Sequence, residues 1–496
     1  MSNTDAAPCM TAATDSFESD ETPETYAEAI SAHARKIQKN SFVCGANYRD
    51  FSKFVNLSPS ERNIQLLDQL QPDLTRAHRS VVCLRFDSDG TRQPNTYAGT
   101  EGPQSFLDRT PLKTGCAEFL FIRGYPSAEW IRVIGSQLRI DPEVFRRHAG
   151  RQHSSGDIRR NYNALVKHGV AGQSIVRRYS IHNENTYTID QLITFCVVKK
   201  NGGYTAVICL DTGRDLRQGP EAPWNKAEAE PDSCLPTIQH PAKVALRTND
   251  QTTSFASEED ADRLLQSTSI PTAKHLPLQY GMLADEDQSL MRSSPIYALN
   301  ELFLFAASSN SQFLNFVKGQ VEDALLNAQS HEGQEELSLI NLRFTKDLLE
   351  ENIGHYSEVI AFLQSKLAAK WKGSDADLAQ DVQDSILRDF ESLLRRAKEL
   401  AARCLDGTAI IMNGAMLRES RKAIEQAEKV ERLTILALIF VPLSFITSAF
   451  GMNFKELGQG EVGMQVFAEV AVPVLCVSLI ICFWGRIHRA ITSLWD

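Results

Sequence analysis

The sequence of 496 residues lacks the arrangements that are typical of enzymes. It has no glycine-rich phosphate loop, no Ser or Cys nucleophile in a recognisable setting, and no His-x-x-x-His pair. Its 10 cysteines form no Cys-x-x-Cys pair, so no zinc site can be read from their spacing, and we expect reduced, structural thiols in the cytosol. The sequence therefore predicts a protein that is not an enzyme and has no resident cofactor.

Basic residues are outnumbered by acidic ones, 52 to 62. The formal net charge is −10, which disfavours nucleic acid as a partner and suits a protein that handles cations. The first 28 residues are acidic, with neither a secretory signal nor the arginine-rich composition of a mitochondrial presequence. We therefore expect a plasma-membrane or vacuolar location rather than a mitochondrial one. A basic stretch around Arg146, Arg147 and His148 is interpreted as a solvated surface.

Two long apolar runs lie near the C-terminal end. Residues 433–450 contain no charge, and a second run covers residues 466–485. A helix that crosses a bilayer needs about 20 such residues at about 1.5 Å each. The two runs predict a pair of transmembrane helices joined by a short loop, with a pair of buried core helices as the alternative.

Charges around these runs predict the orientation of the chain. Basic residues flank the pair on its two outer sides: Arg418, Arg421, Lys422, Lys429 and Arg432 come before it, and Arg486, His488 and Arg489 come after it. The loop between the runs has Lys455 against Glu456 and Glu461. By the positive-inside rule, both termini lie in the cytosol and residues 451–465 lie outside.

The rest of the chain predicts a mixture of strands and helices. Apolar runs rich in β-formers predict strands near residues 79–87, 117–123, 174–181, 192–199 and 204–211. Ser127 is expected to cap a helix that ends near Leu138. Helical periodicity covers residues 295–328, 333–372 and 375–404, and Asp406-Gly407 is a candidate break before a final long helix.

Short motifs near the C-terminal end resemble the CorA family of magnesium transporters. They are Leu433-Thr434, Pro442-Leu443-Ser444-Phe445 and Phe450-Gly451-Met452-Asn453-Phe454. Arg123-Gly124-Tyr125-Pro126-Ser127 and Ile140-Asp141-Pro142-Glu143 resemble the soluble domain of fungal members. The resemblance implies an α+β membrane protein with an N-terminal cytosolic α/β/α domain, a long helical stalk and two C-terminal transmembrane helices.

On this basis the chain divides into eight segments. They are a disordered N-terminus (1–40), a cytosolic α/β domain (41–212), a flexible insertion or linker (213–293), a helical cytosolic domain and stalk (294–432), a first transmembrane helix (433–453), an external loop (454–465), a second transmembrane helix (466–485) and a cytosolic tail (486–496). For the proline-punctuated segment 213–293, ordered loops and short helices are an alternative for part of its length.

A stripe of small and apolar residues follows the first predicted span. Its members recur every three or four positions: Val430, Leu433, Ala437, Val441, Ser444 and Ser448. Two spans cannot enclose a pore, so a conducting form must be an oligomer, and the resemblance implies a homopentamer with this helix lining the pore. Leu433 and Val441 match family positions that form hydrophobic constrictions, and Pro442 is a candidate hinge. Packing of the stripe against the second span is the alternative.

The resemblance assigns Gly451, Met452 and Asn453 to a selectivity filter at the outer mouth, with Asn453 as the contact to the metal ion. Mg²⁺ releases its water reluctantly, and an amide oxygen can accept hydrogen bonds from the hydrated ion. Glu456 and Glu461 either attract cations to the mouth or are plain solvated charges.

These features predict Mg²⁺ uptake driven by the membrane potential. Transport of zinc, cobalt or nickel is one alternative, and a CorA-like membrane scaffold that no longer conducts is another. The resemblance also implies a regulatory magnesium ion between cytosolic domains, but its ligands cannot be mapped among the many Asp and Glu residues.

Overall fold

A computed structural model describes residues 21–36, 45–67, 81–87, 92–150, 175–212, 237, 276–371, 376–450 and 464–492, with gaps at 176, 184–185, 201, 282, 284 and 331–333. The chain divides into two compact units. The first comprises residues 1–326 and 340–405, and the second comprises residues 327–339 and 406–496.

A five-stranded sheet forms the centre of the first unit. Its strands lie in the order β2-β1-β3-β7-β6, and they are β1 (Val81–Phe86), β2 (Arg92–Tyr97), β3 (Ala117–Arg123), β6 (Ile193–Lys200) and β7 (Gly203–Leu210). The central strands β3 and β7 are parallel, and the other pairs are antiparallel. Strands β4 (Arg178–Asn183) and β5 (Thr186–Asp190) form a separate hairpin. All five predicted strand regions thus contain a strand.

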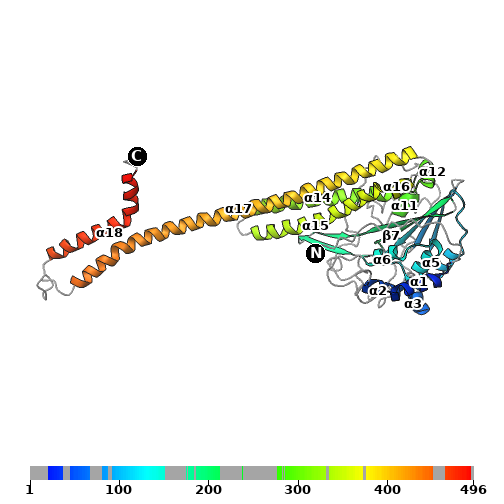
Figure 1. Ribbon diagram of the computed structural model, residues 1–496, viewed down its shortest axis with the longest axis horizontal. Helices are drawn as coiled ribbons and strands as arrows, with labels where there is room; N and C mark the ends of the chain where they lie inside the picture. Colours follow the sequence, from blue (N-terminus) through cyan, green and yellow to red (C-terminus); the bar gives the residue numbers. More distant parts are fainter. Residues whose placement is uncertain are drawn as a thin grey trace, which may run out of the picture. The chain divides into compact units, whose positions relative to one another are not determined.

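Helices cover both faces of this sheet (Figure 1). On β3, Leu120 and Ile122 belong to a core shared with α1 (Pro23–Lys36), α2 (Gly45–Val55) and α5 (Ala128–Leu138). The alternate residues Phe119 and Phe121 pack on Tyr280 of α11 (Leu276–Gly281), with ring centroids 5.1 and 5.4 Å apart. Because successive strand residues point to opposite faces, this alternation confirms the α/β/α layering.

Among the described residues before Pro295, this unit has four shorter helices besides α1, α2, α5 and α11. They are α3 (Pro59–Leu67), α4 (Gly102–Leu107), α6 (Pro142–Gly150) and α12 (Asp285–Ser293). Helices α11 and α12 lie within the predicted linker 213–293, so the alternative of ordered short helices holds for that part. Apart from residue 237, the linker before Leu276 lies outside the described residues.

Helix α1 corrects the prediction of disorder for residues 23–36, whereas residues 1–20 and 37–40 lie outside the described part of the chain. Four side chains of α1 are buried, at a spacing that places them on one helical face: Tyr26, Ala27, Ile30 and Ala34. The Tyr26 hydroxyl donates to the backbone oxygen of Ile140 at 2.8 Å, and a Cβ atom at Gly135 of α5 would lie 2.3 Å from the Tyr26 ring. The prediction was wrong because low overall hydrophobicity conceals an apolar stripe of only four residues.

Helix α5 begins as predicted. The Ser127 hydroxyl accepts a hydrogen bond from the backbone N–H of Trp130 at 3.2 Å, and Glu129 lies in the first turn of the helix. Such a cap satisfies one of the free N–H groups at a helix start. The motif from Arg123 to Ser127 therefore joins the end of the central strand β3 to this capped helix.

A buried ionic cluster lies at the other end of β3. Glu118 is 1% exposed, and its carboxylate lies 2.9 Å from the Arg85 guanidinium and 3.4 Å from that of Arg109. The flanking arginines hold the pKa of Glu118 below its ordinary value although burial alone would raise it. The cluster joins β1, β3 and the loop after α4.

Long helices form the rest of the described chain. After the short α13 (Pro295–Ala298) come α14 (Asn300–Ser330), α15 (Glu335–Leu363), α16 (Lys366–Lys370), α17 (Ala376–Phe450) and α18 (Met464–Thr492). In the first unit, Phe303 of α14 lies 5.7 Å from Phe195 of β6 and 6.1 Å from Phe390 of α17, measured between ring centroids. These contacts attach the helices to the sheet.

The predicted break at Asp406-Gly407 is wrong, because α17 is one helix of 75 residues. A glycine inside a helix costs about 1 kcal/mol relative to alanine, too little to stop a helix with strong periodicity on both sides.

Candidate ion pathway

The C-terminal part of α17 is the one described helix long and apolar enough to cross a membrane. Its most apolar window of 18 residues has a mean hydropathy of 1.8, and only 6% of that window is buried inside the chain. Inside a globular core, a helix of this composition would be mostly buried. The prediction of an apolar helix from Leu433 to Phe450 is thus confirmed, and the burial expected of a core helix is not found.

The second predicted span falls on α18. Its apolar stretch, counted over the described side chains, is the shorter segment Gln465–Ile481. Pro473 lies inside this helix. Crossing of the membrane by residues 466–485 therefore stays a prediction.

The predicted stripe lies on an exposed face of α17. Val430, Leu433 and Val441 are 61%, 66% and 65% exposed. The other three members, Ala437, Ser444 and Ser448, are exposed as well. Within this single chain, the described residues leave all six side chains uncovered.

The opposite face of the same helix is the one that is covered. Ile446 is 6% exposed, and it lies two positions from both Ser444 and Ser448. Two positions along an α-helix turn by about 200°, which places Ile446 on the far side from the stripe. The half-buried Ile439 and Leu443 lie near Ile446 on the helix. A narrow face of the span is thus covered within the chain, and the stripe lies on the exposed remainder, which also includes Phe440 and Phe445.

The α-helix continues through Pro442. The ring of a proline removes one backbone hydrogen bond, so this position can bend more easily than its neighbours. Thr447, one turn beyond, donates its hydroxyl to the backbone oxygens of Leu443 and Ser444, at 3.0 Å each. The role of Pro442 as a hinge stays a prediction.

The predicted mouth lies outside the described residues. Gly451, Met452, Asn453, Glu456 and Glu461 all fall in residues 451–463, between the end of α17 and the start of α18. Phe450, the last residue of α17, is three positions before Asn453. The structure thus brings the stripe onto one helix face and leaves the filter and the loop carboxylates as predictions.

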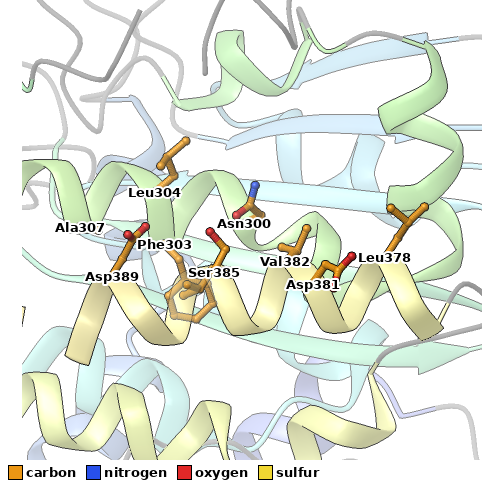
Figure 2. A pocket seen from close by; sticks show the side chains of 10 residues that line it. Asn300, Phe303, Leu304, Ala307, Leu378, Asp381, Val382, Ser385 and Asp389 are labelled. Atoms are coloured by element: carbon orange, nitrogen blue, oxygen red, sulfur yellow. The ribbon is translucent and has the colours of Figure 1, made fainter. Parts of the chain in front are cut away.

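A cavity of about 320 Å³ lies in the first unit between α14 and α17. Figure 2 shows Asp381, Ser385 and Asp389 on α17, with Asn300 and Leu304 on the facing helix. Among the described residues, no group of three or more His, Cys, Asp or Glu side chains is able to hold a metal ion. A regulatory Mg²⁺ between cytosolic domains accordingly stays a prediction.

A second buried polar cluster follows β7. The Asp211 carboxylate accepts two hydrogen bonds from the Arg177 guanidinium at 2.7 Å each, and a third from the backbone N–H of Leu192. His148 is fully buried, with Nε2 3.6 Å from the same carboxylate and Nδ1 3.0 Å from the Thr194 hydroxyl. The interpretation of His148 as solvated surface was therefore wrong. Its helix also carries the buried Val144 and Phe145, and this apolar pattern was the missed signal.

Burial shifts the pKa values of Asp211 and His148 in this cluster. It raises the pKa of Asp211 from 3.8 to about 6, against the opposing effect of Arg177. Burial, with a further contribution from Arg177, holds the pKa of His148 well below 6.5. His148 is thus neutral at physiological pH, whereas Asp211 changes charge near pH 6.

This cluster predicts a pH-dependent stability that Asp211→Asn removes. Between about pH 4 and pH 6 the folded carboxyl holds a proton that the unfolded one releases, so the stability due to protonation is lost as the pH rises. We expect the free energy of unfolding of the wild type, relative to the variant, to fall across this window. Thermal unfolding of both full-length proteins in detergent measures the difference. Since His148 is present in both, parallel curves would contradict the prediction.

Residues 298–486 match the family profile described as CorA-like Mg²⁺ transporter protein. The chain is also 28% identical over 142 residues to a putative metal ion transporter of Schizosaccharomyces pombe. That alignment covers 27% of this chain and 22% of the relative, so the chain spans about a fifth of the length of the curated relative it matches.

Two solved structures are similar at low identity. They are the CorA magnesium transporter from Methanocaldococcus jannaschii (TM-score 0.37, 10% identity, covering 81% of this chain and 96% of the other) and the full-length CmaX protein (TM-score 0.34, 12% identity, covering 83% and 98%).

Proposed function

We propose that this chain is a metal ion transporter of the CorA family, not an enzyme, and that it conducts Mg²⁺ across a membrane through an oligomeric pore lined by α17; the match of residues 298–486 to the family profile supports this. The ion enters at Asn453 and passes the stripe toward the cytosol. The inside-negative potential drives uptake. Five copies around one axis form the conducting unit, with both termini of each copy in the cytosol.

The observation that carries this proposal is the row of small and hydroxyl side chains on the exposed surface of α17. A helix that crosses a bilayer presents apolar residues to lipid on any side, but here the exposed side includes Ala437, Ser444 and Ser448. Small and hydroxyl side chains allow close approach between helices and tolerate water. The covered side, around Ile446, is already engaged within the chain. In an oligomer, the stripe of each copy can face a common central axis.

The stripe changes character along its length. Ser444 and Ser448 lie toward the proposed mouth, and Val430, Leu433 and Val441 lie toward the cytosol. Rings of apolar side chains close a pore by excluding water, whereas hydroxyl groups accept hydrogen bonds from a hydrated ion. We accordingly assign the gate to Leu433 and Val441 and the hydrated part of the pore to the two serines.

The driving force follows from the charge of the ion. Moving one charge through 100 mV is worth about 2.3 kcal/mol, so a divalent ion gains about twice that. A passive pathway therefore accumulates Mg²⁺ against a concentration difference without a nucleotide site. The negative end of α17, at its C-terminus, faces the incoming ion and favours its approach.

Flux into proteoliposomes tests the proposal. Purified protein is reconstituted around a Mg²⁺-sensitive dye, and an inside-negative potential is imposed with K⁺ and valinomycin. We expect Mg²⁺ uptake that rises with the potential and is absent from empty liposomes. Preferential uptake of Zn²⁺, Co²⁺ or Ni²⁺ would reassign the ion, and no uptake of any divalent ion would support the non-conducting scaffold instead.

A further inference from the structure

The segment of α17 just before the apolar run is rich in charged residues of both signs. Residues 418–432 contain five basic and four acidic side chains, so the segment as a whole is nearly neutral. The basic positions recur at spacings of three, four or seven: Arg418, Arg421, Lys422, Lys429 and Arg432. Residues at these spacings share one face of a helix. Glu425 and Glu428 lie on the same face, four positions before Lys429 and Arg432 respectively.

The two basic residues nearest the apolar run lie differently with respect to the stripe. Leu433 follows Arg432 by one position, a turn of about 100°, so Arg432 points away from the stripe. Lys429 is four positions before Leu433, about 40° from it around the helix, so Lys429 lies at the edge of the stripe. In an assembly with the stripe at its axis, Arg432 points toward the surroundings of the ring and Lys429 lies beside the pore face.

The basic residues nearest the apolar run make no ion pair in the described part of the chain. Earlier on α17, Arg403 pairs with Glu322 at 3.2 Å and Arg418 pairs with Glu335 at 2.7 Å. Lys429 and Arg432, by contrast, are exposed, and no described carboxylate lies within 4.0 Å of either. Their charges are available to a partner outside this chain.

Position along the helix identifies that partner. Arg432 and Lys429 lie one and four residues before Leu433, or about 1.5 and 6 Å along the axis. Arg421 and Lys422 lie about 18 and 17 Å before it. The field of a charged membrane surface decays over about 8 Å at physiological ionic strength. Of the five basic residues in 418–432, only Arg432 and Lys429 are therefore within reach of lipid headgroups.

We propose that Lys429 and Arg432 form a binding site for the headgroups of anionic phospholipids in the cytosolic leaflet, at the point where α17 enters the membrane. The proposal rests on the proposed function only in that α17 crosses a bilayer there, with its N-terminal end in the cytosol; it does not require conduction. Basic residues close to an anionic surface attract its lipids, and each raises the affinity about five-fold.

Spin-labelled lipids measure this site directly. The full-length protein is reconstituted in phosphatidylcholine containing a trace of spin-labelled phosphatidylserine or phosphatidylcholine, and the immobilised fraction gives the relative association of the two lipids. We expect the wild type to prefer phosphatidylserine and Lys429→Gln/Arg432→Gln to lose that preference, a drop of up to about 25-fold at the site. Salt should weaken the preference of the wild type.

A second pair on the same face provides the matched control. Arg421→Gln/Lys422→Gln removes the same charge beyond the reach of the headgroups, and it should leave the preference unchanged. Equal loss in both double variants, or no preference in the wild type, would overturn the lipid site. Failure of membrane insertion itself would give a different result, because neither labelled lipid would then be immobilised.

Discussion

Replacing Asn453 by alanine is expected to abolish most of the Mg²⁺ flux. Hydrogen bonds to charged groups are worth about 1.5–3 kcal/mol each, and every 1.4 kcal/mol is about ten-fold, so losing the amide oxygen from each copy should reduce flux by more than about ten-fold. Proteoliposome uptake with the dye measures the rate. Alanine keeps the backbone and Cβ and removes the side-chain amide, so the variant removes the proposed contact with the hydrated ion.

A second variant and a control sharpen this experiment. In Asn453→Asp, a ring of carboxylates should bind Mg²⁺ more tightly and release it more slowly, lowering both the half-saturating concentration and the maximal rate. Thr447→Ala is the control, because that hydroxyl is directed to the backbone of its own helix. A flux through Asn453→Ala equal to that of the wild type would remove Asn453 from the pathway.

Much of the fold could be predicted because strong local patterns decide it. The apolar β-formers of residues 117–123 and 204–211 predict the two central strands, and they form β3 and β7 in parallel. The uncharged run 433–450 predicts an apolar helix for the same reason. In each case, the composition of one segment decides whether it forms a strand or a helix, and contacts with other segments decide only where it lies in the fold.

The wrong predictions have the opposite cause, because contacts with residues distant in the sequence decide the structure at these positions. Helix α1 is ordered by a close fit between Tyr26 and Gly135, more than 100 residues away, and nothing near Tyr26 in the sequence indicates that contact. His148 is buried by an aspartate and an arginine that follow much later in the chain. The role of Asn453 depends on the resemblance to the family alone.

The position of the stripe can be tested with cysteines introduced at adjacent positions of α17. Ala437 belongs to the stripe, and its neighbour Leu436 is also exposed, at 52%, but lies about 100° away around the helix. If the stripe lines a pore, the thiol introduced by Ala437→Cys is in water and reacts with a positively charged methanethiosulfonate. Each modified copy then places a fixed positive charge in the path of a divalent cation.

We expect the reagent to reduce Mg²⁺ uptake by Ala437→Cys to below about a tenth, since like charges in a narrow pore repel by several kcal/mol. Leu436→Cys should keep its uptake, because a side chain facing lipid or a neighbouring helix is not reached from water. The wild type with reagent controls for the exposed native Cys476, which Cys476→Ser removes if needed. If the reagent instead blocked uptake by Leu436→Cys and left Ala437→Cys unaffected, the stripe would not face the pore. That result would favour packing of the stripe against the second span.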